Sequence, residues 1–289
     1  MHVALVRRLS LLLVVTGLAG LPRAASAQCR VEADRGVRPL AVADPASVGM
    51  NPAVLGRIDA IAAEAVARHD VPGAVVLVTH CGAIVWRRAY GDRALVPVAE
   101  PMTVDTIFDL ASITKVVATL PALFVLVEEG RLRLGDAVAR TLPAWDRPVR
   151  RDVTIEMLLT HRSGLPAADP LGLWATDPAA ALARIARVAL VSPPGERFLY
   201  TDLGFLVLGD VVARVSGRPL DAFVRDAIYA PLGMTATGFR PDPSLLGRIA
   251  PTGPRMGTHQ IVRGEAYDPR VRALGGVAGH AGLFSTADD

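Results

Sequence analysis

The stretch Phe108-Asp109-Leu110-Ala111-Ser112-Ile113-Thr114-Lys115 decides how this chain is interpreted. Lys115 is the only lysine among 31 lysine and arginine residues, and Ser112 stands three residues before it. On a helix, this spacing places two side chains on one face, within reach of each other. Arginine keeps its proton at any biological pH, whereas a buried lysine can lose it. The pair is therefore a candidate nucleophile and base.

An apolar run follows the pair and ends at Glu128-Glu129-Gly130. This pattern predicts a buried helix from about residue 112 that is closed by the glycine. A lysine in such a helix is costly unless it is neutralised or paired. The alternative is chance, because any chain must place a lone lysine somewhere, but the apolar surroundings favour the chemical interpretation.

The N-terminus has the features of a secretory signal peptide over residues 1–27. Arg7 and Arg8 precede the apolar stretch Leu9 to Leu21, and Ala25-Ser26-Ala27 is a small-residue cleavage site. The alternative of a membrane anchor is weaker, because a spanning helix needs roughly 20 apolar residues and this stretch is shorter. We therefore expect a secreted or periplasmic protein without a stable membrane span after cleavage.

Removal of the signal peptide would leave an N-terminal extension, residues 28–47, ahead of the main domain. It would also bring the formal net charge from +3 to zero, because three arginines and no acid are lost. Such a balance gives no reason to expect a nucleic-acid partner. Cys29 and Cys81, the two cysteines, could pair in an oxidising compartment, but the sequence leaves this open.

Local patterns predict an α/β layer followed by a mostly helical region. Asn51-Pro52 opens a stretch with helical spacing of apolar residues, and two β-rich runs at 74–79 and 83–90 flank a short turn. From about 112 to 265, helical patterns alternate with loops rich in glycine and proline, without a strong strand. The composition, 51% hydrophobic, suffices for a large core.

Several other chemistries are excluded by their missing motifs. The chain has no GxSxG, HExxH or CxxC pattern, so a hydrolase triad of that kind and a metal centre are not expected. The glycine-rich stretch 274–279 follows no predicted strand and lacks a phosphate-loop pattern. Among four tyrosines, Tyr200 stands out as a second proton-handling group because of its context, Pro194 to Gly204.

Three ordered blocks carry a family resemblance: Phe108 to Lys115, Leu158 to Pro166 and Pro194 to Gly204. They resemble the serine β-lactamase and penicillin-binding-protein superfamily, closest to the class C β-lactamase-like hydrolases, which include carboxylesterases and D-stereospecific peptidases. The similarity extends over residues 48–289. It implies an α/β plus all-α fold of the β-lactamase/transpeptidase type, with an antiparallel sheet flanked by helices, residues 48–111 in the α/β layer and about 112–265 mostly helical.

The resemblance also implies roles for site residues. Ser112 would be the acylated nucleophile, Lys115 would activate it, and Tyr200, which opens a YxN-type motif, would be the base that also protonates the leaving group. The Ser112 backbone N–H would form half of an oxyanion hole. No cofactor or metal is implied.

Asp202 departs from the asparagine that many β-lactamases have at the third position of this motif. A carboxylate cannot donate a hydrogen bond to a substrate carbonyl, so Asp202 as a substrate-binding residue favours an esterase or peptidase over a β-lactamase. The alternative is that Asp202 caps a helix over residues 203–215.

The resemblance implies a third motif, KTG or HxG, on a strand facing the serine. His280-Ala281-Gly282 matches these letters, but Ser285 to Asp289 carries a helix-start pattern and follows too closely. We therefore expect the third motif, the final strands and the C-terminal helix beyond Asp289. His280 and His161 are expected to be structural, with a place for His280 in the cleft left open, and Trp86, Trp145 and Trp174 are expected to pack.

The sequence thus predicts an exported serine hydrolase that acts through an acyl-enzyme on a small-molecule or peptide ester or amide, including cell-wall material. It does not choose among ester, β-lactam and D-peptide substrates, nor an oligomeric state. The alternative is a non-catalytic envelope protein, either a pseudoenzyme that binds peptidoglycan peptides or an inactive fragment.

Overall fold

The structure is a computed structural model that describes residues 40–167, 177–255 and 257–289. The predicted signal peptide, Cys29 with its possible pairing to Cys81, and Trp174 lie outside these residues.

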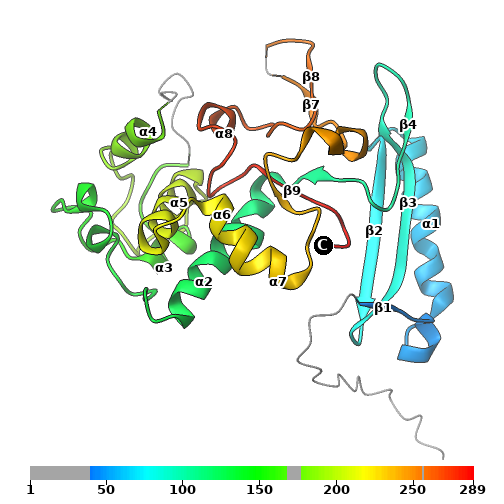
Figure 1. Ribbon diagram of the computed structural model, residues 1–289, viewed down its shortest axis with the longest axis horizontal. Helices are drawn as coiled ribbons and strands as arrows, with labels where there is room; N and C mark the ends of the chain where they lie inside the picture. Colours follow the sequence, from blue (N-terminus) through cyan, green and yellow to red (C-terminus); the bar gives the residue numbers. More distant parts are fainter. Residues whose placement is uncertain (1–39, 168–176, 256) are drawn as a thin grey trace, which may run out of the picture.

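The first layer is a β-hairpin covered on one face by a helix (Figure 1). Asn51 caps the helix by accepting a hydrogen bond from the Ala53 N–H at 2.9 Å, with Pro52 in the first turn. Across the layer, the Tyr90 hydroxyl donates to Asp59 of the helix at 2.8 Å. The elements are α1 (Pro52–Ala67), β2 (Gly73–His80) and β3 (Ala83–Ala94), with β1 (Ala41–Val42) and β4 (Glu100–Pro101) paired to β3.

The predicted helix and hairpin are therefore confirmed. Strands β2 and β3 are antiparallel, with Ala74 opposite Tyr90 and a register shift after Val78. The order β1-β3-β2 places β2 at one edge of this sheet.

A helical region forms the second part and holds the main core. Its central helix, α5, is buried along most of its length, with Thr201 as the N-cap and Gly217, at φ +75°, closing the C-terminus. The helices are α2 (Leu120–Glu128), α3 (Ile155–Leu159), α4 (Pro178–Ile185), α5 (Asp202–Ser216), α6 (Leu220–Val224), α7 (Ala230–Leu232) and α8 (Pro269–Ala273).

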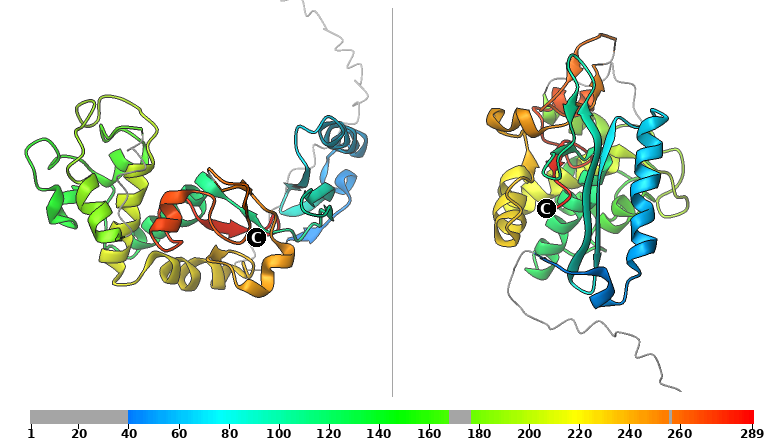
Figure 2. Two further views of the ribbon diagram at one scale, coloured as in Figure 1. Left: turned by 90° about the horizontal axis from the view of Figure 1, so that it is seen from above. Right: turned by 90° about the vertical axis from the view of Figure 1, so that its right-hand side faces the viewer.

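A small sheet lies between the two parts, as the view from above shows (Figure 2). Its order is β5-β9-β6, all pairs antiparallel. Strand β5 leads directly into Ser112, and β9 follows His280, so this sheet brings two distant segments to one place. The strands are β5 (Phe108–Asp109), β6 (Gly238–Phe239) and β9 (Leu283–Ser285).

Three local expectations need correction. The helix predicted from residue 112 begins as a 3₁₀ turn at Ala111–Ile113 and continues as a π-helix at Lys115–Thr119 before α2. Short strands lie within 112–265, at β6, β7 (Gly253–Pro254) and β8 (Ile261–Val262). Each has only two residues, too few for an alternating sequence pattern, and is defined by the strand with which it pairs.

The third correction concerns the helix start predicted at residues 285–289. Ser285 belongs to strand β9 and is buried, because β9 pairs on both sides. The Thr286 hydroxyl does accept the Asp289 N–H at 3.2 Å, which is a cap-like bond, yet residues 286–289 are not helical.

The helical stretch Ala111–Glu128 is long and apolar enough to cross a membrane by composition alone. Core helices of soluble proteins pass the same test, and Ala118, Ala122, Leu123 and Leu126 of this stretch are fully buried in the core. Of the described tryptophans, Trp145 packs in the core as expected, and Trp86 lies under the Arg88 guanidinium in the sheet.

Candidate active site

Ser112 lies at an exposed turn between β5 and the helical stretch. Ala111 immediately before it has φ +43°, a left-handed conformation that costs energy for a residue with a Cβ. Asp109 supports the turn, because its carboxylate accepts the Ala111 N–H at 2.8 Å and the Tyr267 N–H at 2.8 Å. The turn thus presents the Ser112 hydroxyl to solvent at the start of the helical stretch.

Lys115 is only 3% exposed, one turn below Ser112. Its Nζ donates to three acceptors: Ser112 Oγ at 2.9 Å, Asp202 Oδ1 at 2.8 Å and the His280 backbone carbonyl at 3.0 Å. An ammonium has three N–H donors, and here each has a partner. A neutral amine fits equally well, because it can donate to Asp202 and His280 while its lone pair accepts the Ser112 proton.

Tyr200 approaches Ser112 from the other side. Its hydroxyl lies 2.9 Å from Ser112 Oγ, and its ring centroid lies 4.9 Å from Lys115 Nζ. The side chain is 45% exposed, so the phenol lies at the opening of the site and the lysine at its base. The structure thus brings together Ser112, Lys115 and Tyr200, which the sequence separates by up to 88 residues.

Asp202 does not cap helix α5, contrary to the alternative considered from the sequence. Thr201 is the N-cap, since its hydroxyl accepts the Leu203 N–H at 3.2 Å. Asp202 is therefore free to point inward, where Oδ1 accepts from Lys115 and Oδ2 accepts from the Arg270 guanidinium at 2.6 Å. With both oxygens engaged, Asp202 acts on Lys115 and Arg270.

Arg270, Asp268 and His280 extend this cluster. Arg270 also donates to Asp268 Oδ2 at 2.6 Å, and His280 Nε2 lies 3.3 Å from the same oxygen. His280 is 1% exposed, and its backbone carbonyl accepts a hydrogen bond from Lys115. Neither Arg270 nor Asp268 was predicted from the sequence. The one available signal was Asp268-Pro269, an aspartate cap followed by a first-turn proline, which is typical of a helix start.

The ligand atoms of Asp202, Asp268 and His280 lie within 4.8 Å of one another, a spacing that would suit a metal ion. The Arg270 guanidinium, however, already contacts both carboxylates at 2.6 Å. The positive charge that these acids need is therefore supplied by an arginine, and we interpret the group as an ion-pair network.

The electrostatics of the cluster hold its acids ionised. Burial opposes ionisation of Asp202, but hydrogen bonds from Lys115 and Arg270 and the nearby His280 outweigh it and lower its pKa. Burial likewise disfavours the Asp268 anion, yet His280 and Arg270 hold the pKa of that carboxyl well below its usual range. Burial would lower the pKa of Arg270, but its bonds to Asp268 and Asp202 raise it instead.

His161 packs against Tyr200, which supports the expectation that it anchors a loop. The two ring centroids are 4.5 Å apart with planes at 35°, and His161 Nδ1 accepts the Thr201 N–H at 3.1 Å. This bond leaves the proton of a neutral imidazole on Nε2. Burial, and then the Lys115 charge, lower the pKa of His161, so an uncharged ring packs against Tyr200.

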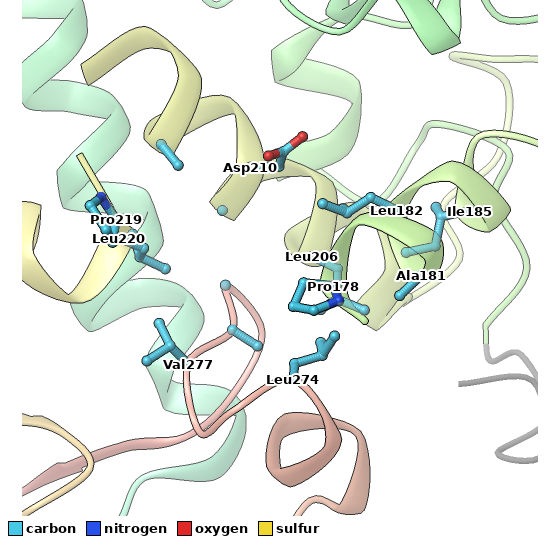
Figure 3. A pocket seen from close by; sticks show the side chains of 14 residues that line it. Pro178, Ala181, Leu182, Ile185, Leu206, Asp210, Pro219, Leu220, Leu274 and Val277 are labelled. Atoms are coloured by element: carbon cyan, nitrogen blue, oxygen red, sulfur yellow. The ribbon is translucent and has the colours of Figure 1, made fainter. Parts of the chain in front are cut away.

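The structure also contains an apolar cavity of about 260 Å³ (Figure 3). Side chains of α4, α5 and the 274–277 loop line it, with Asp210 as its charged group, and none of Ser112, Lys115 or Tyr200 takes part. Burial raises the pKa of Asp210. Gly279, one of the lining residues, approaches α5 so closely that a Cβ there would lie 2.1 Å from the Phe205 carbonyl oxygen.

Comparisons with known proteins point to one family. The family model for Beta-lactamase matches residues 58–289. The putative D-alanyl-D-alanine carboxypeptidase of Escherichia coli strain K12 is 32% identical over 287 residues, covering 86% of this chain. The chain spans 65% of the length of that relative.

Solved structures agree in fold. The class C beta lactamase from Rhodobacter sphaeroides is 26% identical with a TM-score of 0.66, covering 83% of this chain and 63% of that one. The hydrolase EstCE1, which has promiscuous acyltransferase activity, is 26% identical with a TM-score of 0.64, covering 81% and 70%. With a family match over most of its length and a shared fold, this chain belongs to the Beta-lactamase family, within the serine β-lactamase and penicillin-binding-protein superfamily.

Proposed function

We propose that this protein is a serine hydrolase that works by acyl transfer, with Ser112 as the nucleophile. The observation that carries the proposal is that Ser112 Oγ lies 2.9 Å from both Lys115 Nζ and Tyr200 Oη. A serine hydroxyl is a weak nucleophile until an adjacent base takes its proton. The resemblance implies Tyr200 as that base; we propose instead that Lys115 takes the proton in acylation, with Tyr200 as the acid there and as the base in deacylation.

In the acylation half, Lys115 as a neutral amine takes the Ser112 proton while Oγ bonds to the substrate carbonyl carbon. The carbonyl oxygen takes up the displaced electron pair and is stabilised by the Ser112 backbone N–H at the start of the helical stretch. When the tetrahedral species collapses, Tyr200 gives its phenolic proton to the departing alcohol or amine. The result is an acyl-enzyme with Lys115 as ammonium and Tyr200 as phenolate.

In the deacylation half, the Tyr200 phenolate takes a proton from water as the water oxygen attacks the acyl carbon. Ser112 Oγ then leaves and recovers its proton from Lys115. Protons and charges balance over the cycle, because each group acts as an acid in one half and a base in the other.

We infer that the substrate is a small ester or amide, with peptides ending in D-alanine as the first class to test. The named relatives comprise a putative D-alanyl-D-alanine carboxypeptidase, a hydrolase with acyltransferase activity and a β-lactamase. We also propose export to the envelope, in keeping with the N-terminal pattern. A panel of p-nitrophenyl esters, nitrocefin and D-Ala-D-Ala peptides would separate the three classes.

Labelling with a fluorophosphonate tests the nucleophile. The protein is expressed from the complete reading frame of its gene, because the chain spans 65% of the E. coli relative. We expect an adduct on the peptide containing Ser112, absent in Ser112→Ala and retained in Ser244→Ala, which removes another exposed serine. Activity that survives Ser112→Ala would contradict the proposal, and peptide binding without any adduct would favour the non-catalytic alternative.

A further inference from the structure

The side chains around Lys115 form a closed ring of hydrogen bonds. Lys115 contacts Asp202, Asp202 contacts Arg270, Arg270 contacts Asp268, and Asp268 lies against the His280 imidazole. The His280 backbone carbonyl then returns to Lys115 at 3.0 Å. Lys115 thus lies beside the Asp202 carboxylate, which also binds a second cation, Arg270.

This arrangement matters because a carboxylate alone would oppose the function proposed for Lys115. The Lys115 and Asp202 side chains are 4% and 18% exposed, so their charges are poorly screened. An unshared Asp202 carboxylate at 2.8 Å would hold the proton on Lys115, whereas the proposed acylation needs a neutral amine.

Arg270 counters this effect. Its guanidinium contacts Asp202 Oδ2 at 2.6 Å, is 12% exposed itself, and keeps its charge at any working pH. Asp268 accepts from the Arg270 backbone N–H at 2.7 Å and from the guanidinium at 2.6 Å, which fixes the arginine side chain. Seen from Lys115, Arg270 thus reduces the negative charge of the Asp202 acceptor.

We propose that Arg270 is a positioning residue that offsets the Asp202 carboxylate, so that Lys115 can accept and release the Ser112 proton. This inference rests on the proposed function of Lys115. Asp202 and Arg270 act as one unit, so replacing either one changes the charge beside Lys115, and replacing both by neutral amides brings that charge back toward its original value.

Other groups that face Lys115 come from several elements and stay in place in the test. These are Ser112 one turn above, the Tyr200 phenol, the uncharged His161 ring behind it, the ring of Phe205 at 5.7 Å, and the Asp268–His280 pair behind Arg270. Of these, only Asp268 carries a fixed negative charge. It shares the Arg270 guanidinium with Asp202, so the arginine offsets the two carboxylates in part.

The experiment is a double-mutant cycle with Asp202→Asn, Arg270→Gln and both together. Lys115 is the only lysine of residues 1–289, so incorporation of ¹³C-labelled lysine gives a sparse side-chain NMR spectrum. The Lys115 signal is assigned as the one lost in Lys115→Arg, and its pH titration reports this amine directly. We expect the titration to move to higher pH in Arg270→Gln, where the carboxylate is unshared. It should move to lower pH in Asp202→Asn, where the guanidinium is unopposed, and return close to wild type in the double variant.

Activity should follow the same pattern. We expect kcat/KM at neutral pH to fall about tenfold or more in Arg270→Gln, where Lys115 keeps its proton to higher pH, and to recover to within about threefold in the double variant, since charges in contact couple strongly. In Asp202→Asn the neutral amine is favoured, so kcat/KM at neutral pH should not fall for lack of a base. The acid limb of the pH profile should move with the lysine signal. Arg272→Gln is the matched control, because Arg272 lies on the same helix but contacts the carbonyls of Ala266 and Tyr267.

An activity loss of Arg270→Gln that persists in full in the double variant, or a lysine signal that titrates alike in all four proteins, would overturn the proposal. The lysine titration does not depend on turnover, so its result is independent of whether Ser112 forms an adduct. A wild-type protein without a Ser112 adduct refutes the proposed function, whereas an adduct with an unchanged lysine titration refutes the role of Arg270 alone.

Discussion

At the scale of single residues, the site depends on which side chain caps helix α5. Thr201 supplies the cap and also donates its hydroxyl to the Pro166 carbonyl at 2.6 Å. Asp202, one position later, is thereby turned toward Lys115 and away from the helix backbone. An aspartate at the N-cap position, 201, would bond to the helix backbone, whereas Asp202 in the next position contacts the proposed base.

Tyr200→Phe tests the phenolic proton. The substitution keeps the ring against His161 and removes the oxygen beside Ser112. We expect kcat to fall about 100-fold or more with little change in KM, because general acid–base groups contribute that much and the ring still fills its place. The measurement is steady-state kinetics on the best substrate of the panel. Tyr267→Phe, another exposed tyrosine, should leave kcat unchanged, and a near-normal kcat in Tyr200→Phe would remove Tyr200 from the mechanism.

At the scale of elements, the loop before β9 supplies the third acceptor of Lys115. Its position depends on Gly279, which lies against α5, and on the Thr119 hydroxyl, which donates to the Gly279 carbonyl at 2.7 Å. The Leu283 N–H further along donates to the Thr114 hydroxyl at 3.1 Å. The helical stretch that carries Lys115 therefore also positions the loop whose His280 carbonyl accepts from Lys115.

Gly279→Ala tests this close approach. A Cβ would lie 2.1 Å from the Phe205 carbonyl oxygen, so the loop must move and the His280 carbonyl would leave Lys115. We expect a loss of about 1–3 kcal/mol in the free energy of unfolding, as overpacking typically costs, together with a changed chemical shift of the Lys115 side chain. Urea denaturation and NMR measure the two effects.

The control for this substitution is Gly247→Ala, where a Cβ meets nothing within 4 Å. It should be neutral in both measurements. A stable Gly279→Ala protein with an unchanged lysine signal would show that the loop does not need this contact.

At the scale of the whole molecule, charged groups join segments that are far apart in the chain. Arg263 binds Glu100 through two hydrogen bonds at 2.7 and 2.6 Å, which ties the segment after β8 to β4 of the hairpin layer. These bonds, and one from Arg93, lower the pKa of Glu100 to about 2. Asp202 and Asp268 join α5 and α8 to Lys115 in the same way.

These acids make the stability of the fold depend on pH. The pKa values of Asp202 and Asp268 are lower in the folded protein than the ordinary value of about 3.9, so the unfolded chain binds protons first. Their stabilisation is complete above about pH 5 and is lost as pH falls through 4 and below. We expect the free energy of unfolding, from urea titrations between pH 7 and 3, to fall over this window.

Asp268→Asn provides the comparison. It should be less stable than wild type at pH 7, because Arg270 loses a charged partner, and it should lose less stability on acidification. Parallel pH profiles for the two proteins would mean that Asp268 does not contribute to the acid sensitivity.

Local patterns predicted a good part of this structure. The cap at Asn51, the β2–β3 hairpin and the pairing of Ser112 with Lys115 depend on residues within a few positions of one another, and each is found as expected. The 3₁₀ turn at Ala111–Ile113 and the π-helix at Lys115–Thr119 were missed, because an apolar run does not show whether each N–H bonds to the carbonyl three, four or five residues before it.

The sequence by itself determined the chemistry available to this protein: one lysine on a helix beside a serine, and a tyrosine in a recognisable block. Only the tertiary structure decided the surroundings of that lysine. The His280 carbonyl, the inward turn of Asp202 and its sharing by Arg270 join segments up to 165 residues apart. No periodicity or spacing encodes such contacts, because they arise when β9 pairs between β5 and β6 and carries its preceding loop against α5.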